Sequence, residues 1–109
     1  MALDLTTLRK LVSLDVNDPL SRFALGKNLY EQGTTVEEWV EAADHLRFSK
    51  IEAPEHLATY HVLAQALLRL RQIDEAKIVL AQGIKRVAAA GGGMGRDLGP
   101  AMQTMLDGL

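Results

Sequence analysis

Apolar residues recur every three to four positions along most of this chain, which is the spacing of amphipathic α-helices. Asp18 followed by Pro19 predicts a helix start, because an acidic side chain caps the first turn and proline fits its first position. Gly33 predicts the end of this helix, in the left-handed conformation that glycine adopts readily. The buried face of the predicted helix comprises Leu25, Gly26 and Leu29.

A second helix is predicted to run from Thr35 to the proline at position 54. Thr35 and Glu38 stand in capping-box spacing, and Pro54 marks the helix end. The apolar side of this helix comprises Val36, Trp39, Ala42, Ala43 and Leu46, with Ser49 as a further candidate. Trp39 is predicted to pack in the core, although a tryptophan also suits the centre of a protein interface.

The same design occurs again in the next segment of the chain. Residues 55–87 predict a helix through Leu70, a turn over residues 71–73 and a helix that begins near Asp74. Leu25, Gly26 and Leu29 recur 38 positions later as Leu63, Ala64 and Leu67, and Ala42, Leu46 and Ser49 recur 34 positions later as Ala76, Leu80 and Gly83. The two displacements differ by four residues, which lie between residues 33 and 41. Four residues are about one helical turn, so the apolar face of the following helix keeps its orientation.

The joint register of these residues resembles the tetratricopeptide repeat, a family of stacked helical hairpins. The second copy fits the family pattern at Tyr60, Leu63, Ala64, Leu67, Ala76, Leu80 and Gly83. The first copy fits at Leu25, Gly26, Leu29, Ala42, Leu46, Ser49 and Pro54, with Arg22 in place of an aromatic residue. The resemblance covers roughly residues 19–87 and implies an all-α, right-handed solenoid.

A single domain of about six helices is expected over residues 1–109. The repeats occupy residues 19–54 and 55–89, a glycine-rich linker occupies 90–99, and residues 1–17 and 100–109 form helical end pieces. The apolar stripe of the N-terminal piece is Leu5, Leu8, Leu11, Val12 and, as a further candidate, Val16. That of the C-terminal piece is Met102, Met105, Leu106 and, as a further candidate, Leu109. Solenoids need such caps because a terminal hairpin otherwise exposes its stacking face.

Composition narrows the range of functions. The 109 residues contain 48% apolar and 24% charged residues, which is typical of a folded soluble protein. A formal net charge of −2 gives no basic excess for nucleic acid or an anionic membrane. The absence of cysteine excludes disulfides, thiol catalysis and cysteine-ligated zinc. No segment suits a signal peptide or a membrane span, so a cytoplasmic protein is expected.

Other candidate sites have weak signals. The stretch AAAGGGMGRDLGP, residues 88–100, follows a predicted helix and completes neither a Walker nor a dinucleotide pattern at Gly91, Gly93 and Met94. It therefore predicts a linker, with Arg96 as a solvated charge, rather than an anion site. The histidines at 45, 56 and 61 lack the spacing of a metal motif. No catalytic constellation is recognisable, so no enzyme activity and no cofactor are expected.

A peptide-binding groove is the function that the resemblance implies. The first helix of each hairpin would line it, and steps of three and four residues place each set of side chains on one stripe. The candidate groove residues are Phe23, Lys27, Tyr30, His61, Gln65 and Arg69. A non-catalytic module that binds a protein or peptide is therefore expected. The alternatives are a homo-oligomeric assembly protein and a small-ligand or metal-binding protein.

Overall fold

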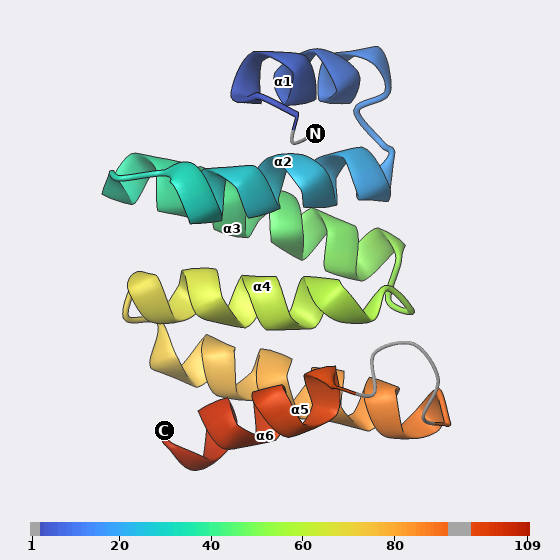
Figure 1. Ribbon diagram of the computed structural model, residues 1–109, viewed down its shortest axis with the longest axis vertical. Coiled ribbons are helices and arrows are strands. Elements are labelled where there is room, and N and C mark those ends of the chain that lie inside the picture. The colour runs from blue at the N-terminus through green and yellow to red at the C-terminus, as the bar shows by residue number, and fades with distance from the viewer. Residues whose placement is uncertain (1–2, 92–96) are drawn as a thin grey trace.

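Six α-helices make up the computed structural model, which describes residues 3–91 and 97–109 (Figure 1). They are α1 (Leu5–Leu14), α2 (Pro19–Gln32), α3 (Val36–Glu52), α4 (Leu57–Arg69), α5 (Ile73–Ala89) and α6 (Leu98–Asp107). No β-strand occurs in the described residues, which confirms the expectation of an all-α chain with about six helices. The C-terminal helix begins before residue 100, so the segment that joins it to α5 is shorter than predicted. Residues 92–96 of the predicted linker, with Gly93, Met94 and Arg96, lie outside the described residues.

The predicted helix starts are confirmed at α2 and α3. The Asp18 carboxylate accepts a hydrogen bond from the Leu20 N–H at 3.3 Å, with Pro19 at the first helical position. At α3, the Thr35 hydroxyl accepts from the Glu38 N–H and the Glu38 carboxylate accepts from the Thr35 N–H, which completes the capping box. Both helices therefore begin where local side chains satisfy otherwise unpaired amides.

The predicted left-handed stop at Gly33 is wrong. Gly33 ends α2 in an extended conformation with φ of −69°. Glycine is needed there because the backbone passes close to α2. A Cβ atom at position 33 would lie 2.2 Å from the Leu29 carbonyl oxygen. The left-handed turn instead follows α4, where Arg71 has φ of 59° and the Gln72 N–H donates to the Leu67 carbonyl at 2.9 Å.

The helices stack one after another along the longest axis of the molecule (Figure 1). Helices α2 and α3 pack as one antiparallel hairpin, and α4 and α5 pack as a second. The last helix of each hairpin also contacts the following helix, so α3 packs on α4 and α5 packs on α6. Helix α2 touches α4, and α4 touches α6, while α1 packs against α2. Each contact made by the first hairpin thus has a counterpart one hairpin later.

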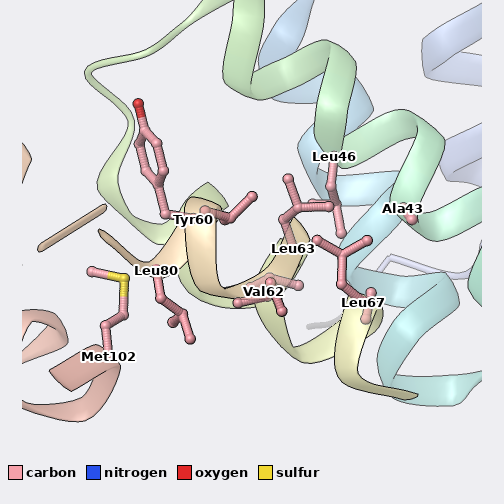
Figure 2. Close-up of a cluster of buried hydrophobic side chains, with 12 residues drawn as sticks. Ala43, Leu46, Tyr60, Val62, Leu63, Leu67, Leu80 and Met102 are labelled. Atoms are coloured by element: carbon pink, nitrogen blue, oxygen red, sulfur yellow. The ribbon is translucent and has the colours of Figure 1, made fainter. Parts of the chain in front are cut away.

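The predicted core positions are buried at both hairpins. Figure 2 shows the cluster in which Leu46 of the first hairpin meets Leu63, Leu67 and Leu80 of the second. The fully buried members shared by the two copies are Leu25, Leu29, Ala42, Leu46, Leu63, Ala64, Leu67, Ala76 and Leu80. Gly26 is buried where α2 crosses α3, because an added Cβ would lie 2.8 Å from Leu46 Cγ and 3.1 Å from the Ala42 carbonyl oxygen. Small residues therefore allow the two helices of this hairpin to approach closely.

The end pieces bury only part of their predicted stripes. Leu8 and Val12 of α1 pack on Leu25 and Leu29, and Met102 of α6 is fully buried beside Leu80. Four predicted stripe residues are exposed instead, which corrects the expectation: Leu11, Val16, Val36 and Leu109. The terminal helices each have few neighbours, and Val36 is 57% exposed in the first turn of α3, so nothing covers these side chains.

Candidate functional site

The predicted groove residues lie on α2 and α4, and the structure divides them between two shallow hollows. Tyr30, Gln65 and Arg69, together with Leu68, line a hollow of about 290 Å³ between the C-terminal parts of these helices. Phe23 and Lys27 belong to a different hollow of about 270 Å³, which also includes residues of α1. His61 lines neither hollow and is partly buried. The six residues therefore do not form one continuous site.

Arg69 is held beside two aromatic rings. Its guanidinium carbon lies 5.4 Å from the centre of the Tyr30 ring and 5.2 Å from the centre of the Trp39 ring. Both distances are within the range of cation–π attraction. Among the described residues, no carboxylate pairs with Arg69 and no hydrogen bond engages its side chain. The N–H groups of a positioned, exposed guanidinium thus remain available to a ligand.

Trp39 is a functional candidate that the sequence interpretation assigned to the core. It is only partly buried, and its ring faces Arg69 near the hollow lined by Tyr30 and Gln65. The indole Nε1 atom is buried without a hydrogen-bond partner among the described residues. An unpaired buried donor is uncommon, because it loses its bond to water without replacement. The prediction that Trp39 packs in the core is therefore correct only in part, because the residue is partly buried and lies outside both clusters of buried side chains.

Phe23 has a structural role as well as an exposed edge. Its ring meets the His56 ring at 4.6 Å between centroids and at 72°, and it also packs against the central core. His56 in turn shares a 2.8 Å hydrogen bond with the Thr59 hydroxyl at the start of α4. His61 lies further along α4, where burial lowers its pKa below the ordinary value of 6.5. His56 thus takes part in the packing of α2 on α4, and His61 is a partly buried side chain of α4.

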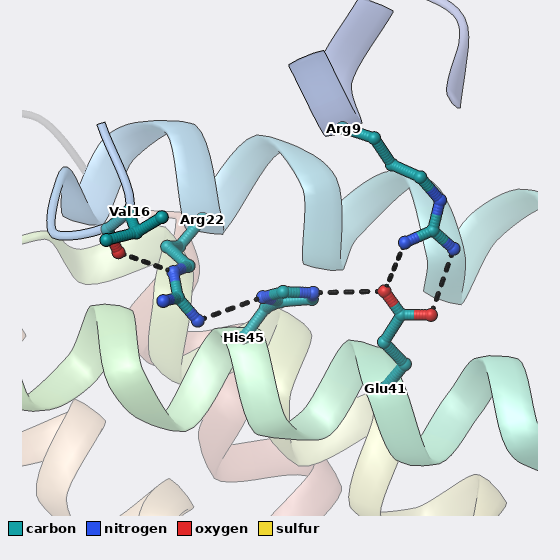
Figure 3. A network of polar contacts seen from close by, with 5 residues as sticks. All are labelled: Arg9, Val16, Arg22, Glu41 and His45. Atoms are coloured by element: carbon teal, nitrogen blue, oxygen red, sulfur yellow. Dashed lines mark hydrogen bonds and ion pairs between the residues drawn. The ribbon is translucent and has the colours of Figure 1, made fainter. Parts of the chain in front are cut away.

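A polar network connects the first three helices (Figure 3). Arg9 of α1 donates two hydrogen bonds to the Glu41 carboxylate, at 2.5 and 3.0 Å, and Glu41 accepts from His45 Nε2 at 3.1 Å. Arg22 donates to His45 Nδ1 at 3.4 Å and to the Val16 carbonyl at 2.9 Å. Because arginine can only donate, His45 Nδ1 accepts, and the ring proton lies on Nε2.

The electrostatics of this network favour ionised Glu41. The hydrogen bond from Arg9 lowers the pKa of Glu41, and the bond from His45 acts in the same direction. Arg22 also lies over the Phe48 ring, with its guanidinium carbon 4.3 Å from the centroid. The residue that departs from the family pattern therefore has contacts of its own in the first hairpin.

The Arg9–Glu41 pair recurs in the next layer. Arg47 of α3 donates to the Glu75 carboxylate at 2.7 and 2.8 Å, and this bond lowers the pKa of Glu75. Arg47 lies 38 positions after Arg9, and Glu75 lies 34 positions after Glu41, which are the displacements of the core leucines and alanines. The repeat therefore includes a bidentate ion pair between successive helices α1, α3 and α5.

Comparisons with known proteins give the chain no relatives. No family model, curated protein or solved structure matches it. Within residues 3–91 and 97–109, no helix is long and apolar enough to cross a membrane, and no three His, Cys, Asp or Glu side chains gather into a metal-binding group. A function must therefore be argued from the repeat and from the surfaces described above.

Proposed function

We propose that this chain is a small tetratricopeptide-like, right-handed solenoid that binds a peptide segment of a partner protein without catalysis. The hollow of Tyr30, Gln65 and Arg69 on α2 and α4 carries this proposal. It combines an aromatic ring, an amide and an unpaired guanidinium on the side where the resemblance places a groove. Such a mixture suits a peptide, whose backbone carbonyls and carboxylates need donors and whose apolar side chains need contact area.

Two observations support the repeat architecture. The helix contacts α2–α3, α3–α4 and α2–α4 recur as α4–α5, α5–α6 and α4–α6. The pair Arg9–Glu41 recurs as Arg47–Glu75 with the displacements of the core residues. Each hairpin buries its apolar face only against its neighbours, which is the physical basis of a solenoid. The rigid stack would present the hollow with little loss of conformational freedom on binding.

Arg69 would be the anchor of the bound peptide. The rings of Tyr30 and Trp39 restrict its guanidinium, so less side-chain entropy is lost when a ligand oxygen accepts its N–H groups. Gln65 lies one turn earlier on α4 and adds a donor and an acceptor for a peptide group. Because this hollow is small and open, we expect affinities in about the micromolar range.

Selection from a displayed peptide library tests this function. Enriched peptides should bind the double variant Tyr30→Ala/Arg69→Ala about tenfold or more weakly than the original chain, because both the stacked cation and its ring are removed. Lys77→Ala removes one exposed charge on α5 and serves as the control, with a change below about twofold. Enrichment of no peptide, or equal affinity of the double variant, would contradict the proposal.

Self-association is a second candidate function, favoured by an apolar surface near the N-terminus. Leu14 is 74% exposed at the end of α1, and Val16 and Leu20 follow it with more than half of their surface exposed. Clustered apolar side chains of this kind often mark contacts between proteins. Sedimentation at increasing concentration should show a dimer if this surface pairs, and Leu14→Ser/Leu20→Ser should abolish it. A monomer at all concentrations would exclude this candidate.

A further inference from the structure

A second surface differs in chemistry from the proposed peptide groove. A hollow of about 510 Å³ is lined by residues from the ends of α3 and α5 and by Tyr60 near the start of α4. These helix ends lie on the same side of the stack (Figure 1). Three cationic side chains line it: Lys50 from the last turn of α3, and Lys85 and Arg86 from the end of α5. No acidic residue is among the described residues that line it. It is therefore a basic hollow on a chain whose net charge is −2.

The cations of this basic hollow are not paired with carboxylates. Elsewhere in the stack, Arg9 of α1 pairs with Glu41 of α3, and Arg47 of α3 pairs with Glu75 of α5. Lys50, Lys85 and Arg86 form no ion pair with any described residue. The Lys50 amino group donates to the Gln82 side-chain oxygen at 2.9 Å, which fixes its position between α3 and α5 without neutralising it. Lys50 also contributes, after Arg47, to the lowered pKa of Glu75, so most of the unpaired positive charge of the hollow is on Lys85 and Arg86.

Apolar surface accompanies these charges. Ile51 is 71% exposed at the edge of the hollow, although isoleucine is usually buried. Pro54 and Tyr60 complete this side, and the Tyr60 hydroxyl already donates to the Pro54 carbonyl at 2.6 Å. Because Tyr60 is only 3% exposed, Ile51 and the partly buried Pro54 provide the apolar surface at this edge. A ligand that fits would carry both apolar and negatively charged groups.

The partial charge at the ends of α3 and α5 explains only part of why these cations lie together. Lys50 and Arg86 lie in the last turns of their helices, where a cation is favoured by the partial negative charge of the unpaired carbonyls. That effect does not explain why the two helix ends and Lys85 surround one hollow with exposed Ile51 at its edge. Binding of an acidic, partly apolar segment would use the cations and the isoleucine together.

We propose that the basic hollow binds an acidic, amphipathic peptide segment of a partner protein. Glutamate or aspartate side chains would pair with Lys50, Lys85 and Arg86, and apolar side chains would cover Ile51 and Pro54. This surface is formed by α3, α5 and the start of α4, whereas the groove hollow is formed by α2 and α4. A result that contradicts one of these sites would therefore not contradict the other.

Titration with a synthetic peptide rich in glutamate and leucine tests this proposal. Calorimetry should show binding that weakens as salt is raised from about 0.05 to about 0.5 M, because screening reduces the attraction between exposed charges. Lys85→Ala/Arg86→Ala should reduce the affinity about tenfold or more, since it removes two of three charge contacts. NMR signals of Tyr60 and Gln82 should shift on addition of the peptide.

Matched controls separate this site from general charge and from the groove. Lys10→Ala/Lys77→Ala removes the same number of exposed charges from other places and should change the affinity by less than about twofold. Tyr30→Ala/Arg69→Ala should leave binding of the acidic peptide unchanged. Circular dichroism of each variant should retain the helical signal, because all substituted cations are exposed.

Three outcomes would overturn the proposal. The first is an equal loss of affinity in the Lys85/Arg86 and Lys10/Lys77 double variants, which would indicate only non-specific attraction. The second is failure of the acidic peptide to bind at low salt. The third is tighter binding of a single-stranded oligonucleotide than of the acidic peptide, which would assign the hollow to a different class of ligand.

Discussion

The two hairpins have the same register but different chemistry at equivalent positions. In the second, Tyr60 is buried against Gly83 and Met102, where an added glycine Cβ would lie 2.7 Å from the tyrosine Cβ. In the first, Arg22 takes the equivalent place and contacts His45 and a loop carbonyl. Met102 of α6 packs at the second position, whereas Arg22 at the first lies over the Phe48 ring of α3. The same position is therefore an apolar core contact in one hairpin and part of a polar, partly exposed network in the other.

The neighbouring core position shows the same difference. Val79 in α5 is fully buried, and its counterpart 34 residues earlier is His45, which takes part in the network with Glu41. A polar residue is tolerated there because each ring nitrogen has a partner. The two hairpins therefore share buried leucines and small residues at equivalent positions, while Arg22 and His45 of the first are replaced by buried Tyr60 and Val79 in the second.

Substitution of the two equivalent residues should give the largest contrast. Tyr60→Ala should lower the free energy of unfolding by about 3 to 5 kcal/mol, because it leaves a cavity at a packed aromatic site. Arg22→Ala should lower it by no more than about 1.5 kcal/mol, because Arg22 is partly exposed and its hydrogen bonds exchange with water. Urea denaturation measures both values, and equal losses would contradict the comparison.

Larger side chains at the helix crossings should destabilise the protein less in the second hairpin than in the first. Ala64→Leu should cost about 1 to 3 kcal/mol of unfolding free energy, because the added atoms enter a fully buried crossing. Gly26→Leu should cost more than Ala64→Leu, because even a Cβ at position 26 would lie 2.8 Å from Leu46 Cγ. The exposed Ala81→Leu is the control and should be nearly neutral. Thermal unfolding measures these losses of stability. An unchanged melting temperature for Ala64→Leu would contradict the assigned register of the two hairpins.

The two Arg–Glu pairs should give the smallest effect, visible as a pH dependence. Both glutamates have a pKa below the ordinary value of 4.5 in the folded chain, so their contribution to stability is present above that pH and is lost as pH falls through the folded pKa. Because both pairs are partly exposed, each contribution should stay below about 1 kcal/mol. Glu41→Gln and Glu75→Gln should each reduce the loss of stability between about pH 6 and pH 3.

A similar reduction from both glutamine variants would support the repetition of the ion pair. If only one variant had an effect, the two ion pairs would differ in strength. Their equivalent positions in the repeat would then not lead to equal contributions to stability. High salt should reduce the effect of both pairs, because exposed charges are screened.

Helix positions and the core were predictable because they depend on local rules. Apolar spacing, the Asp18 and Thr35 caps and the paired leucines each act within a helix or between adjacent helices. The conformation of Gly33 was not predictable, since it depends on how closely the carbonyl of Leu29 approaches after packing. The exposure of Val36 likewise depends on the absence of a neighbouring helix at the hairpin tip.

The candidate site was predictable only in part. Tyr30, Gln65 and Arg69 meet in one hollow as expected from their stripes, but Phe23 and Lys27 belong to another because α1 lies beside them. The repeated Arg–Glu pairs were missed, although their displacements of 38 and 34 residues match those of the core and could have indicated them.

The indole N–H of Trp39 provides the most direct test of the proposed groove. It is the only tryptophan in the chain, so its NMR signal is unique, and its ring lies beside Arg69. On addition of a selected peptide, we expect this signal to shift together with those of Tyr30, Gln65 and Arg69, and we expect Arg69→Ala to suppress the shifts. Shifts confined to other surfaces, with the Trp39 signal unchanged at saturating peptide, would contradict binding in the groove.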